Sequence, residues 1–338
     1  MKDSHLSVPG LSTPFLIGNV AIRNRVVLAP MSGITDLPFR QLAWRFGAGL
    51  VVTEMVASRE LVGNRHESWA RLKGAGLKPH MVQLAGRDPH YMGEAARIAA
   101  DQGADIIDIN MGCPARKVTS GDCGSALMRE PEHALRIVAA VVAASPVPVT
   151  LKMRLGWDEN SINAPFLAKR AEDAGISAVI VHGRTRMQFY EGRADWEAIR
   201  AVRDVLSVPL VANGDVDTPE DAADILHRSG ADAVMVGRAC QGRPWHAGAL
   251  AGQAAPAAEA IPALAVEHYD AMLEFYGEAA GVRHARKHLG WYLDRARVAV
   301  SGDIRAAVMT SKHPAEVRAL MTSALSAVPN DEAMKEAA

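Results

Sequence analysis

Two cationic side chains lie at the end of a short apolar segment, where they could bind a ligand. Lys152 and Arg154 lie two residues apart at the end of residues 149–153, and on a β-strand such a pair shares one face. Burying both without an anionic partner is costly. The pair therefore favours an anionic or electron-rich ligand, and salt bridges to buried acids such as Asp108 are the alternative.

Glycines and a further arginine follow two other apolar segments. Asn213-Gly214-Asp215 ends one of them, and Gly237-Arg238 ends the next. Glycine allows backbone N–H groups to approach a phosphate, and arginine supplies a planar fork; tight turns are the alternative. With Lys152, these residues favour a phosphorylated, planar, electron-accepting cofactor, for which FMN fits. No G-x-G-x-x-G motif follows a strand, so a bound dinucleotide is not indicated.

Cys113 lies in a Gly-Cys-Pro sequence directly after residues 106–110. A thiol with a pKa near about 8.5 is mostly protonated at neutral pH and can act as a general acid. The alternative, a small buried hydrophobic residue, is the interpretation we favour for Cys123 and Cys240. Three cysteines without a C-x-x-C spacing indicate a reducing compartment and no metal site.

A repeated pattern indicates the scaffold that positions these groups. Four segments share a helix end, a glycine, a short turn and an apolar strand, with the glycines at 47, 103, 175 and 230. Eight strand candidates precede residue 240: 26–30, 50–54, 81–85, 106–110, 149–153, 178–182, 210–214 and 233–237. Helical patterns, such as 131–144 and 219–227, alternate with them. The sequence predicts an α/β fold, a (β/α)8 TIM barrel, with an open parallel sheet as the alternative. In such barrels the active site lies at the carboxyl ends of the strands, which the polar residues above follow.

The last quarter of the chain, from residue 251 onward, differs in composition and pattern from the part before it. We expect a barrel domain over residues 1–250, an Ala/Pro-rich linker over 251–262, a helical domain over 263–330 and a flexible tail over 331–338. Helical patterns cover 264–279, 282–300 and 314–327, and no strand candidate remains. The sequence therefore predicts a C-terminal all-helical domain.

One part of the helical region is strongly basic, although the whole chain has a net charge of −1. Residues 281–312 hold seven Lys or Arg against two Asp, a balance of +5. On a helix, Arg283, Arg286 and Lys287 form one stripe, and Ala285, Leu289, Tyr292 and Ala296 form another. A solvated charged face is one interpretation, and RNA backbone contact is the other. Arg116 and Lys117 beside the barrel mouth favour RNA.

Composition narrows the class of protein. Hydrophobic residues make up 49% and charged residues 22% of 338 residues, which is typical of a globular chain. No apolar run spans a bilayer and no signal peptide is recognisable. We expect a cytoplasmic protein without membrane contact, and a monomer.

Several motifs together resemble one family. They are Ala29-Pro30-Met31-Ser32-Gly33-Ile34-Thr35-Asp36, Asp108-Ile109-Asn110-Met111-Gly112-Cys113-Pro114, Leu151-Lys152-Met153-Arg154-Leu155-Gly156-Trp157, Val181-His182-Gly183-Arg184-Thr185-Arg186, Ala212-Asn213-Gly214-Asp215 and Val236-Gly237-Arg238. From about residue 10 to residue 300 the chain resembles the tRNA-dihydrouridine synthases, and within them the bacterial B-type subgroup, which has also been labelled nitrogen-regulation proteins.

The resemblance implies a reaction and a set of roles. The family binds FMN, takes hydride from NADPH and reduces the C5–C6 bond of uracil in tRNA, with hydride passing from flavin N5 to C6 and a proton to C5. Cys113 would donate that proton. The flavin would be held by Ala29, Pro30, Met31, Gln83, Lys152, His182, Asn213, Gly214, Asp215, Gly237 and Arg238. For the tRNA we expect contacts from Asn110, Arg154, Arg116, Lys117, Arg283, Arg286 and Lys287. The resemblance also implies a D-loop uridine, with position 17 favoured.

Two other functions remain open at this point. A flavin-dependent dehydrogenase of a free pyrimidine would use the same barrel, cofactor and cysteine, but would leave the basic helical extension without a task. A non-catalytic RNA-binding or regulatory protein on the same fold would carry no flavin.

Overall fold

The computed structural model describes residues 10–297 and 299–327. The chain divides into two compact units, one formed by Met1–Ala239 and His246–Gln253, the other by Cys240–Trp245 and Ala254–Ala338. The short segment His246–Gln253 therefore returns to the first unit after the chain has already contributed to the second. We describe each unit by itself.

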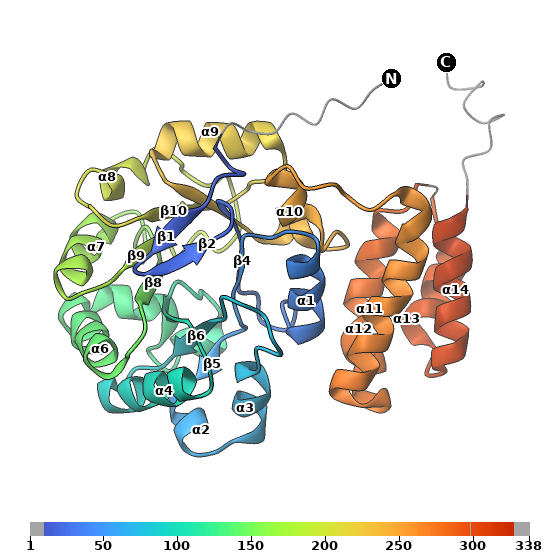
Figure 1. The fold of residues 1–338 in the computed structure, drawn as a ribbon, viewed down its shortest axis with the longest axis horizontal. Helices are drawn as coiled ribbons and strands as arrows, with labels where there is room; N and C mark the ends of the chain where they lie inside the picture. The colour runs from blue at the N-terminus through green and yellow to red at the C-terminus, as the bar shows by residue number, and fades with distance from the viewer. Residues whose placement is uncertain (1–9, 298, 328–338) are drawn as a thin grey trace. The chain divides into compact units, whose positions relative to one another are not determined.

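The first unit is built around a parallel sheet that curls into a barrel (Figure 1). Its strands are β3 (Val26–Leu28), β4 (Leu50–Val51), β5 (Val56–Ala57), β6 (Met81–Ala85), β7 (Ile106–Met111), β8 (Val149–Arg154), β9 (Ala178–His182), β10 (Leu210–Asn213) and β11 (Ala233–Val236). The order β4-β3-β11-β10-β9-β8-β7-β6-β5 begins and ends in the same stretch of chain. A bridge from Val52 to Met81 continues that stretch, so residues 50–57 form one interrupted strand that closes the ring. The prediction of a (β/α)8 barrel is confirmed.

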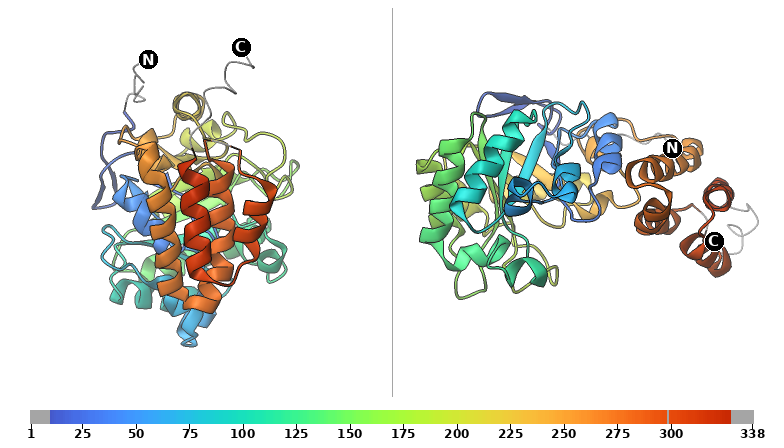
Figure 2. Two further views of the ribbon diagram at one scale, coloured as in Figure 1. Left: turned by 90° about the vertical axis from the view of Figure 1, so that its right-hand side faces the viewer. Right: turned by 90° about the horizontal axis from the view of Figure 1, so that it is seen from below.

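Helices lie outside the sheet between successive strands (Figures 1 and 2). They are α1 (Leu37–Arg45), α2 (Ser58–Val62), α3 (His66–Leu72), α4 (Pro89–Asp101), α5 (Arg116–Thr119), α6 (Pro131–Ala144), α7 (Ala164–Asp173), α8 (Arg200–Arg203), α9 (Pro219–Ser229) and α10 (His246–Leu250), with 3-10 turns η1 (Gly124–Arg129) and η2 (Arg238–Cys240). α9 shows why such helices begin and end where they do. The side chains of Thr218 and Asp221 form a capping box around Pro219, and Gly230 ends the helix in the left-handed conformation.

A small β-hairpin precedes the barrel and was not predicted. β1 (Phe15–Ile17) and β2 (Val20–Ile22) pair antiparallel. Phe15, Ile17 and Ile22 are buried in one apolar cluster with residues from most barrel strands, among them Met81 and Ile106 near the strand starts. The hairpin thus packs against the amino-terminal end of the barrel core, away from the carboxyl ends of the strands. Its strands are three residues long, too short to show a clear alternation.

The second unit is helical. It contains η3 (Ala258–Ala260), α11 (Ile261–Tyr276), α12 (Glu278–Asp294), α13 (Gly302–Thr310) and α14 (Pro314–Ser326). The pattern over 282–300 predicted a helix that is too long: α12 ends at Asp294, and a new helix, α13, begins after Ser301, whose hydroxyl accepts the N–H of Ile304. Among the described residues, no helix has the length and apolarity needed to cross a membrane.

Candidate functional site

Neighbouring barrel strands bring the predicted polar side chains to one level of the ring. In the parallel register Asn110 of β7 lies beside Lys152 of β8, and Asn213 of β10 lies beside His182 of β9. These residues come from segments far apart in the chain. All four are buried. The strand register therefore assembles a polar interior near the carboxyl ends of the sheet.

A chain of hydrogen bonds fixes the orientation of two amides. Asn110 donates from Nδ2 to Oε1 of Gln83 at 2.7 Å, and Gln83 donates from Nε2 to Oδ2 of Asp108 at 2.7 Å. Thr150 donates from Oγ1 to the other Asp108 oxygen at 2.6 Å. Burial raises the pKa of Asp108 to about 6, although these donors and Lys152 oppose the rise. Gln83 is thereby held rigidly beside Asn110.

Lys152 is a buried cation without a close carboxylate. Its Nζ donates to Oδ1 of Asn213 at 3.2 Å, and Asn213 in turn donates to the carbonyl of Met235 at 2.8 Å. Within the described residues, no acid lies within the 4.0 Å of an ion pair with Lys152 or Arg154. Burial lowers the pKa of Lys152 to about 8, with the more distant Asp108 acting against that fall. The alternative of a direct salt bridge to Asp108 is wrong, and Lys152 stays suited to an electron-rich ligand.

Cys113 is anchored through its backbone to the same amide cluster. The N–H groups of Gly112 and Cys113 both donate to Oδ1 of Asn110, at 3.3 and 3.1 Å. The Cys113 carbonyl accepts from the N–H of Ser125 at 3.1 Å and from its hydroxyl at 2.8 Å. Burial raises the pKa of the Cys113 thiol, and this outweighs the nearby cations Arg154 and Lys152. The thiol is therefore protonated at neutral pH.

Arg154 joins two loops of the barrel rim. It is 1% exposed, and it donates to the carbonyls of Gly112 at 2.9 Å and of Thr185 and Phe189 at 2.8 Å each. Burial lowers its pKa to about 10, so the guanidinium keeps its charge at neutral pH. Its described hydrogen bonds thus go to the protein, and they hold the Cys113 loop and the loop after β9 together.

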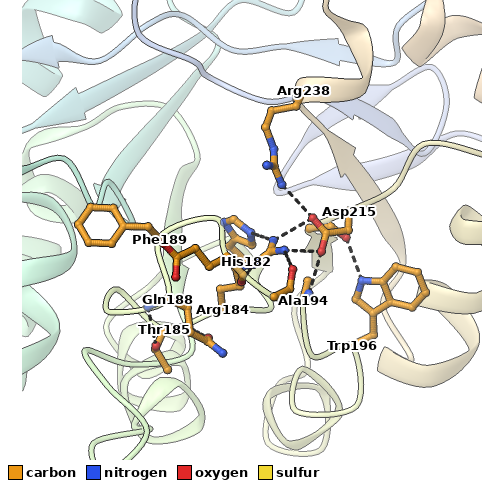
Figure 3. Close-up of polar contacts among 12 residues, drawn as sticks. His182, Arg184, Thr185, Gln188, Phe189, Ala194, Trp196, Asp215 and Arg238 are labelled. Atoms are coloured by element: carbon orange, nitrogen blue, oxygen red, sulfur yellow. Dashed lines mark hydrogen bonds and ion pairs between the residues drawn. The ribbon is translucent and has the colours of Figure 1, made fainter.

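A second cluster centres on Asp215 (Figure 3). Arg184 donates to both of its oxygens, from Nη1 at 2.9 Å and from Nη2 at 2.5 Å, and Arg238 donates at 2.9 Å. The N–H of Ala194 adds a bond of 2.8 Å. Burial acts to raise the pKa of Asp215, but these donors outweigh it, and the pKa lies below its usual value. Asp215 therefore orients the half-exposed Arg238.

Arg184 and Tyr190 are site residues to which sequence reasoning assigned no role. Arg184 is 1% exposed and also donates to the carbonyls of Glu191 and Gly192, so it shapes the loop after β9. Tyr190 is 52% exposed, and its ring centroid lies 4.9 Å from the Arg238 guanidinium and 6.3 Å from the His182 ring. The sequence did offer one indication of their role, because both residues follow His182 by fewer than nine positions and so belong to the loop at the carboxyl end of β9. Burial, with four cations nearby, lowers the pKa of His182 well below its usual value, so this ring is neutral.

Two glycines follow β10 and β11, one in crowded surroundings and one in open surroundings. Gly214 has a φ of +128°, and a Cβ there would lie 2.6 Å from Cβ of Ala194. A Cβ on Gly237 would meet only Met31 Sδ at 3.4 Å and Ala29 Cβ at 3.5 Å within 4 Å. Predicted residues 29–31 thus lie beside Gly237, at the junction of the first and eighth barrel strands. This edge can receive a phosphate on its backbone N–H groups.

The remaining predicted residues take no part in the hydrogen bonds of this cluster. Arg116 and Lys117 are on the exposed helix α5. Arg283 and Lys287 are on α12 of the helical unit, with Arg283 exposed. Arg286 donates from Nη2 to the carbonyls of Thr310 at 3.2 Å and Ser311 at 3.5 Å. It therefore caps the carboxyl end of α13, a position that favours a cation.

The fold and the site define a class of protein: a (β/α)8 barrel with a cluster of buried, hydrogen-bonded polar residues, among them Lys152, at the carboxyl ends of its strands. Comparison with solved structures agrees. Histamine dehydrogenase from Rhizobium sp. 4-9 matches with a TM-score of 0.55 at 14% identity, over 71% of this chain and 47% of that one, so the match spans about half of that enzyme. Morphinone reductase matches with a TM-score of 0.53 at 16% identity, over 74% and 92%. At these identities the likeness concerns the fold.

Sequence comparisons identify the family. The family model "Dihydrouridine synthase (Dus)" matches residues 27–329. A probable tRNA-dihydrouridine synthase of Rhizobium leguminosarum bv. phaseoli is 70% identical over 91% of this chain and 97% of its own length. A tRNA-dihydrouridine synthase B of Xanthomonas axonopodis pv. citri is 48% identical over 88% and 92%. The chain belongs to the dihydrouridine synthase family and is an oxidoreductase, which confirms the resemblance seen in the motifs.

Proposed function

We propose that this enzyme reduces the C5–C6 bond of a D-loop uridine in tRNA, with FMN as the bound hydride carrier, NADPH as the reductant and Cys113 as the proton donor. The observation that carries the proposal is one amide, Asn110. It holds the backbone of Cys113 on one side and Gln83 on the other, next to Lys152. Proton donor and cofactor seat are thus built on a single rigid group.

The residues present fit a flavin mononucleotide. Lys152 offers a cation to the edge of a planar ring, and bound FMN supplies hydride to C6 of the uracil. Gln83, whose amide is bonded to Asn110 and Asp108, would contribute its remaining N–H. Gly214, Gly237 and Arg238 offer close backbone approach and a guanidinium to a phosphate. Ala29, Pro30, Met31, His182, Asn213 and Asp215 complete the proposed seat.

The protein contributes the proton. Reduction at C6 leaves negative charge at C5 and the C4 oxygen, and a neutral acid nearby must quench it. The raised pKa of the Cys113 thiol keeps the proton on sulfur until that moment. Arg154 contributes by holding Gly112 and the loop after β9, so its role is positioning. The exposed ring of Tyr190 is available to the base or its neighbours.

The tRNA requires a surface beyond the pocket. The target base must leave its stack to enter the barrel mouth. Arg116 and Lys117 are placed to meet the backbone near the Cys113 loop, and Arg283 and Lys287 provide a basic surface on α12. The relatives named tRNA-dihydrouridine synthase support this substrate. The choice of position 17 follows from the motif resemblance alone. Such a substrate implies a location in the cytoplasm. The proposal treats the enzyme as a monomer.

The test uses purified protein and an unmodified tRNA transcript. We expect flavin absorption in the protein, oxidation of NADPH that depends on the transcript, and a mass increase of 2 Da at one D-loop nucleotide, located by mass spectrometry. A transcript with cytidine at position 17 should lose the product. Turnover of free uracil or orotate that is indifferent to tRNA would instead establish the free-pyrimidine dehydrogenase, and a colourless, inactive protein would establish the non-catalytic alternative.

A further inference from the structure

The loop that carries Cys113 is well anchored at its base and sparsely held at its tip. Cys113 is fixed by Asn110 and by Ser125, as described above. Between them, the backbone of residues 115–122 bonds mainly to itself, through the short helix α5 and the turn that follows it. The position of this tip must therefore depend on side chains that reach it from outside residues 115–122.

Three arginines from three places reach this segment. Arg186, from the loop after β9, has its Nη2 at 3.4 Å from the hydroxyl of Thr119. Asp122 accepts an ion pair from Arg87 at 2.9 Å and one from Arg129 at 3.4 Å. The last of these lies at the end of η1, inside the loop itself.

Two of those arginines converge on one aromatic ring. The guanidinium carbon of Arg129 lies 4.2 Å from the ring centroid of Trp157, and that of Arg186 lies 4.7 Å from it. Both distances are within the range of cation–π attraction. Trp157 therefore gives the two cations a common partner on the loop after β8.

The backbone of Trp157 is itself fixed. Its carbonyl accepts the N–H of Met187 at 2.9 Å, and the carbonyl of Gly156 accepts the N–H of Arg186 at 2.9 Å. A Cβ on Gly156 would lie 2.2 Å from the carbonyl oxygen of Ser161, so the loop is close-packed there. The ring is thus presented by two loops that are bonded to each other, whereas the backbone of residues 115–122 bonds mainly within its own segment.

We propose that Trp157 is a positioning residue for the proton donor: its ring, with Arg129 and Arg186, latches the segment 113–130 in the conformation that sets the place of Cys113. The assembly is called here the Trp157 latch and consists of these three side chains. This inference rests on the proposed role of Cys113. It adds a residue that touches neither cofactor nor base and acts through the loop.

The first test measures opening of the loop without any tRNA. Alkylation of Cys113 by iodoacetamide, followed residue by residue by mass spectrometry, reports how often the loop opens. Trp157→Leu keeps an apolar side chain but removes the ring. We expect Cys113 to be alkylated about tenfold faster in that variant, which corresponds to about 1.4 kcal/mol, the sum of two exposed cation–π contacts. Hydrogen exchange in residues 114–123 should rise in parallel.

Further variants separate the latch from general destabilisation. Trp157→Phe retains a π face and should restore most of the protection. Arg186→Gln removes one cation and the Thr119 contact without changing the ring, and should give an intermediate rate. Phe166→Leu is the matched control, because Arg170 lies 5.3 Å from that ring and neither residue belongs to the Cys113 loop. Its Cys113 alkylation should equal that of the unmodified protein.

The second test asks whether the latch serves the reaction. In Trp157→Leu we expect flavin reduction by NADPH to proceed at its normal rate, while kcat for dihydrouridine formation falls by up to about twofold and the KM for tRNA changes little, because a tenfold shift towards the open loop leaves the closed loop well populated. Unchanged Cys113 alkylation in Trp157→Leu, or an equal rise at buried Cys240, would overturn the latch. A fully active Cys113→Ala variant would instead contradict the proposed role of Cys113 as proton donor. The alkylation rates would still show whether the Trp157 latch holds the loop.

Discussion

Asn110 shows how much of this site depends on one small side chain. Its amide nitrogen orients Gln83, and its amide oxygen receives the N–H groups of Gly112 and Cys113. Asparagine suits this double task because its two ends differ: one donates and the other accepts. An aspartate in its place could not donate to Gln83, which would leave that buried amide oxygen without its described donor.

The proton donor is testable by a single substitution. Cys113→Ala should retain bound flavin and its reduction by NADPH, because the residues proposed for the cofactor are elsewhere. Dihydrouridine formation should fall by about 10²- to 10⁴-fold, the usual contribution of a general acid. Single-turnover oxidation of reduced enzyme by unmodified tRNA is the measurement. Full activity of the variant would remove Cys113 from the mechanism.

At the scale of elements, the loops at the rim of the barrel are held by hydrogen bonds and ion pairs of arginine side chains. The loop after β9 is shaped by Arg184, which binds Asp215 and the carbonyls of Glu191 and Gly192. A planar guanidinium can serve a carboxylate and carbonyls at once, which an ammonium group cannot do in the same geometry.

Arg184→Lys should therefore disturb both the loop and the cofactor seat. Losing the two-point contact leaves Asp215 and nearby carbonyls incompletely bonded, and we expect the free energy of unfolding to fall by about 2–3 kcal/mol. Flavin retention should also weaken, because Asp215 orients Arg238. Urea denaturation and flavin content after gel filtration measure the two effects. Arg228→Lys, in an exposed pair with Asp224 at 3.4 Å, is the control and should change stability by less than about 1 kcal/mol.

The stability of the helical unit should depend on pH. His268 of α11 is buried against the ring of His288, with centroids 4.8 Å apart, and against Tyr292, whose hydroxyl is 3.3 Å from Nδ1. Burial lowers the pKa of His268 to about 4 and that of His288 well below its usual value. The two shifts have the same sign, because desolvation disfavours the charged ring in both cases.

This unit should lose stability as the pH falls from about 6.5 towards 4. In that window the unfolded chain binds a proton at His268 and the folded chain does not, so protonation favours unfolding, by up to about 3 kcal/mol. Hydrogen exchange in α11 and α12 as a function of pH measures it. His268→Gln should flatten the dependence, leaving the part due to His288, whereas the exposed His90→Gln should leave it unchanged. An identical pH dependence in His268→Gln would contradict the assignment.

For the whole molecule, the distribution of charge matters more than its sum. The chain is nearly neutral, yet residues 281–312 carry a balance of +5. On α12, Leu289 and Tyr292 are buried while Arg283 is exposed, so the helix has a packed face and a basic face. The two-stripe pattern predicted from the sequence is present from Arg283 to Tyr292, but Ala296 lies beyond the end of α12, and Arg286 is occupied with the end of α13.

Reversing the charge of Arg283 and Lys287 together should weaken tRNA binding about tenfold or more at low salt, and less at high salt, because backbone contacts act through counterion release. Flavin content should stay the same. Reversing Arg97 and Arg136, exposed on α4 and α6, changes the net charge equally and should have a smaller effect. Electrophoretic mobility shift at two salt concentrations distinguishes these results. Equal tRNA affinity in the two double variants would reject the basic face of α12 as the RNA surface.

The sequence by itself determined which segments are strands, that they alternate with helices in a barrel, and that polar residues gather at the carboxyl ends of the strands. Buried parallel strands are continuous apolar runs, and the residue after each run must lie at the carboxyl end, so Lys152, Asn213 and Arg238 could be placed before any coordinates. The glycines at the helix ends, such as Gly103 and Gly230, have the positive φ that the repeat predicted. These are properties of segments a few residues long.

Only the tertiary structure decided what those residues touch. Three sets of contacts join loops that are at least 28 residues apart in the chain. They are the ion pair of Arg184 with Asp215, the bonds of Arg154 to three carbonyls, and the contacts of Arg129 and Arg186 with the ring of Trp157. A strand can be predicted from the pattern of a few consecutive residues. The side-chain contacts of a loop depend instead on which other loops the closed barrel brings beside it. For that reason the sequence indicates the chemistry of this protein, and the folded ring of strands determines the geometry that holds it.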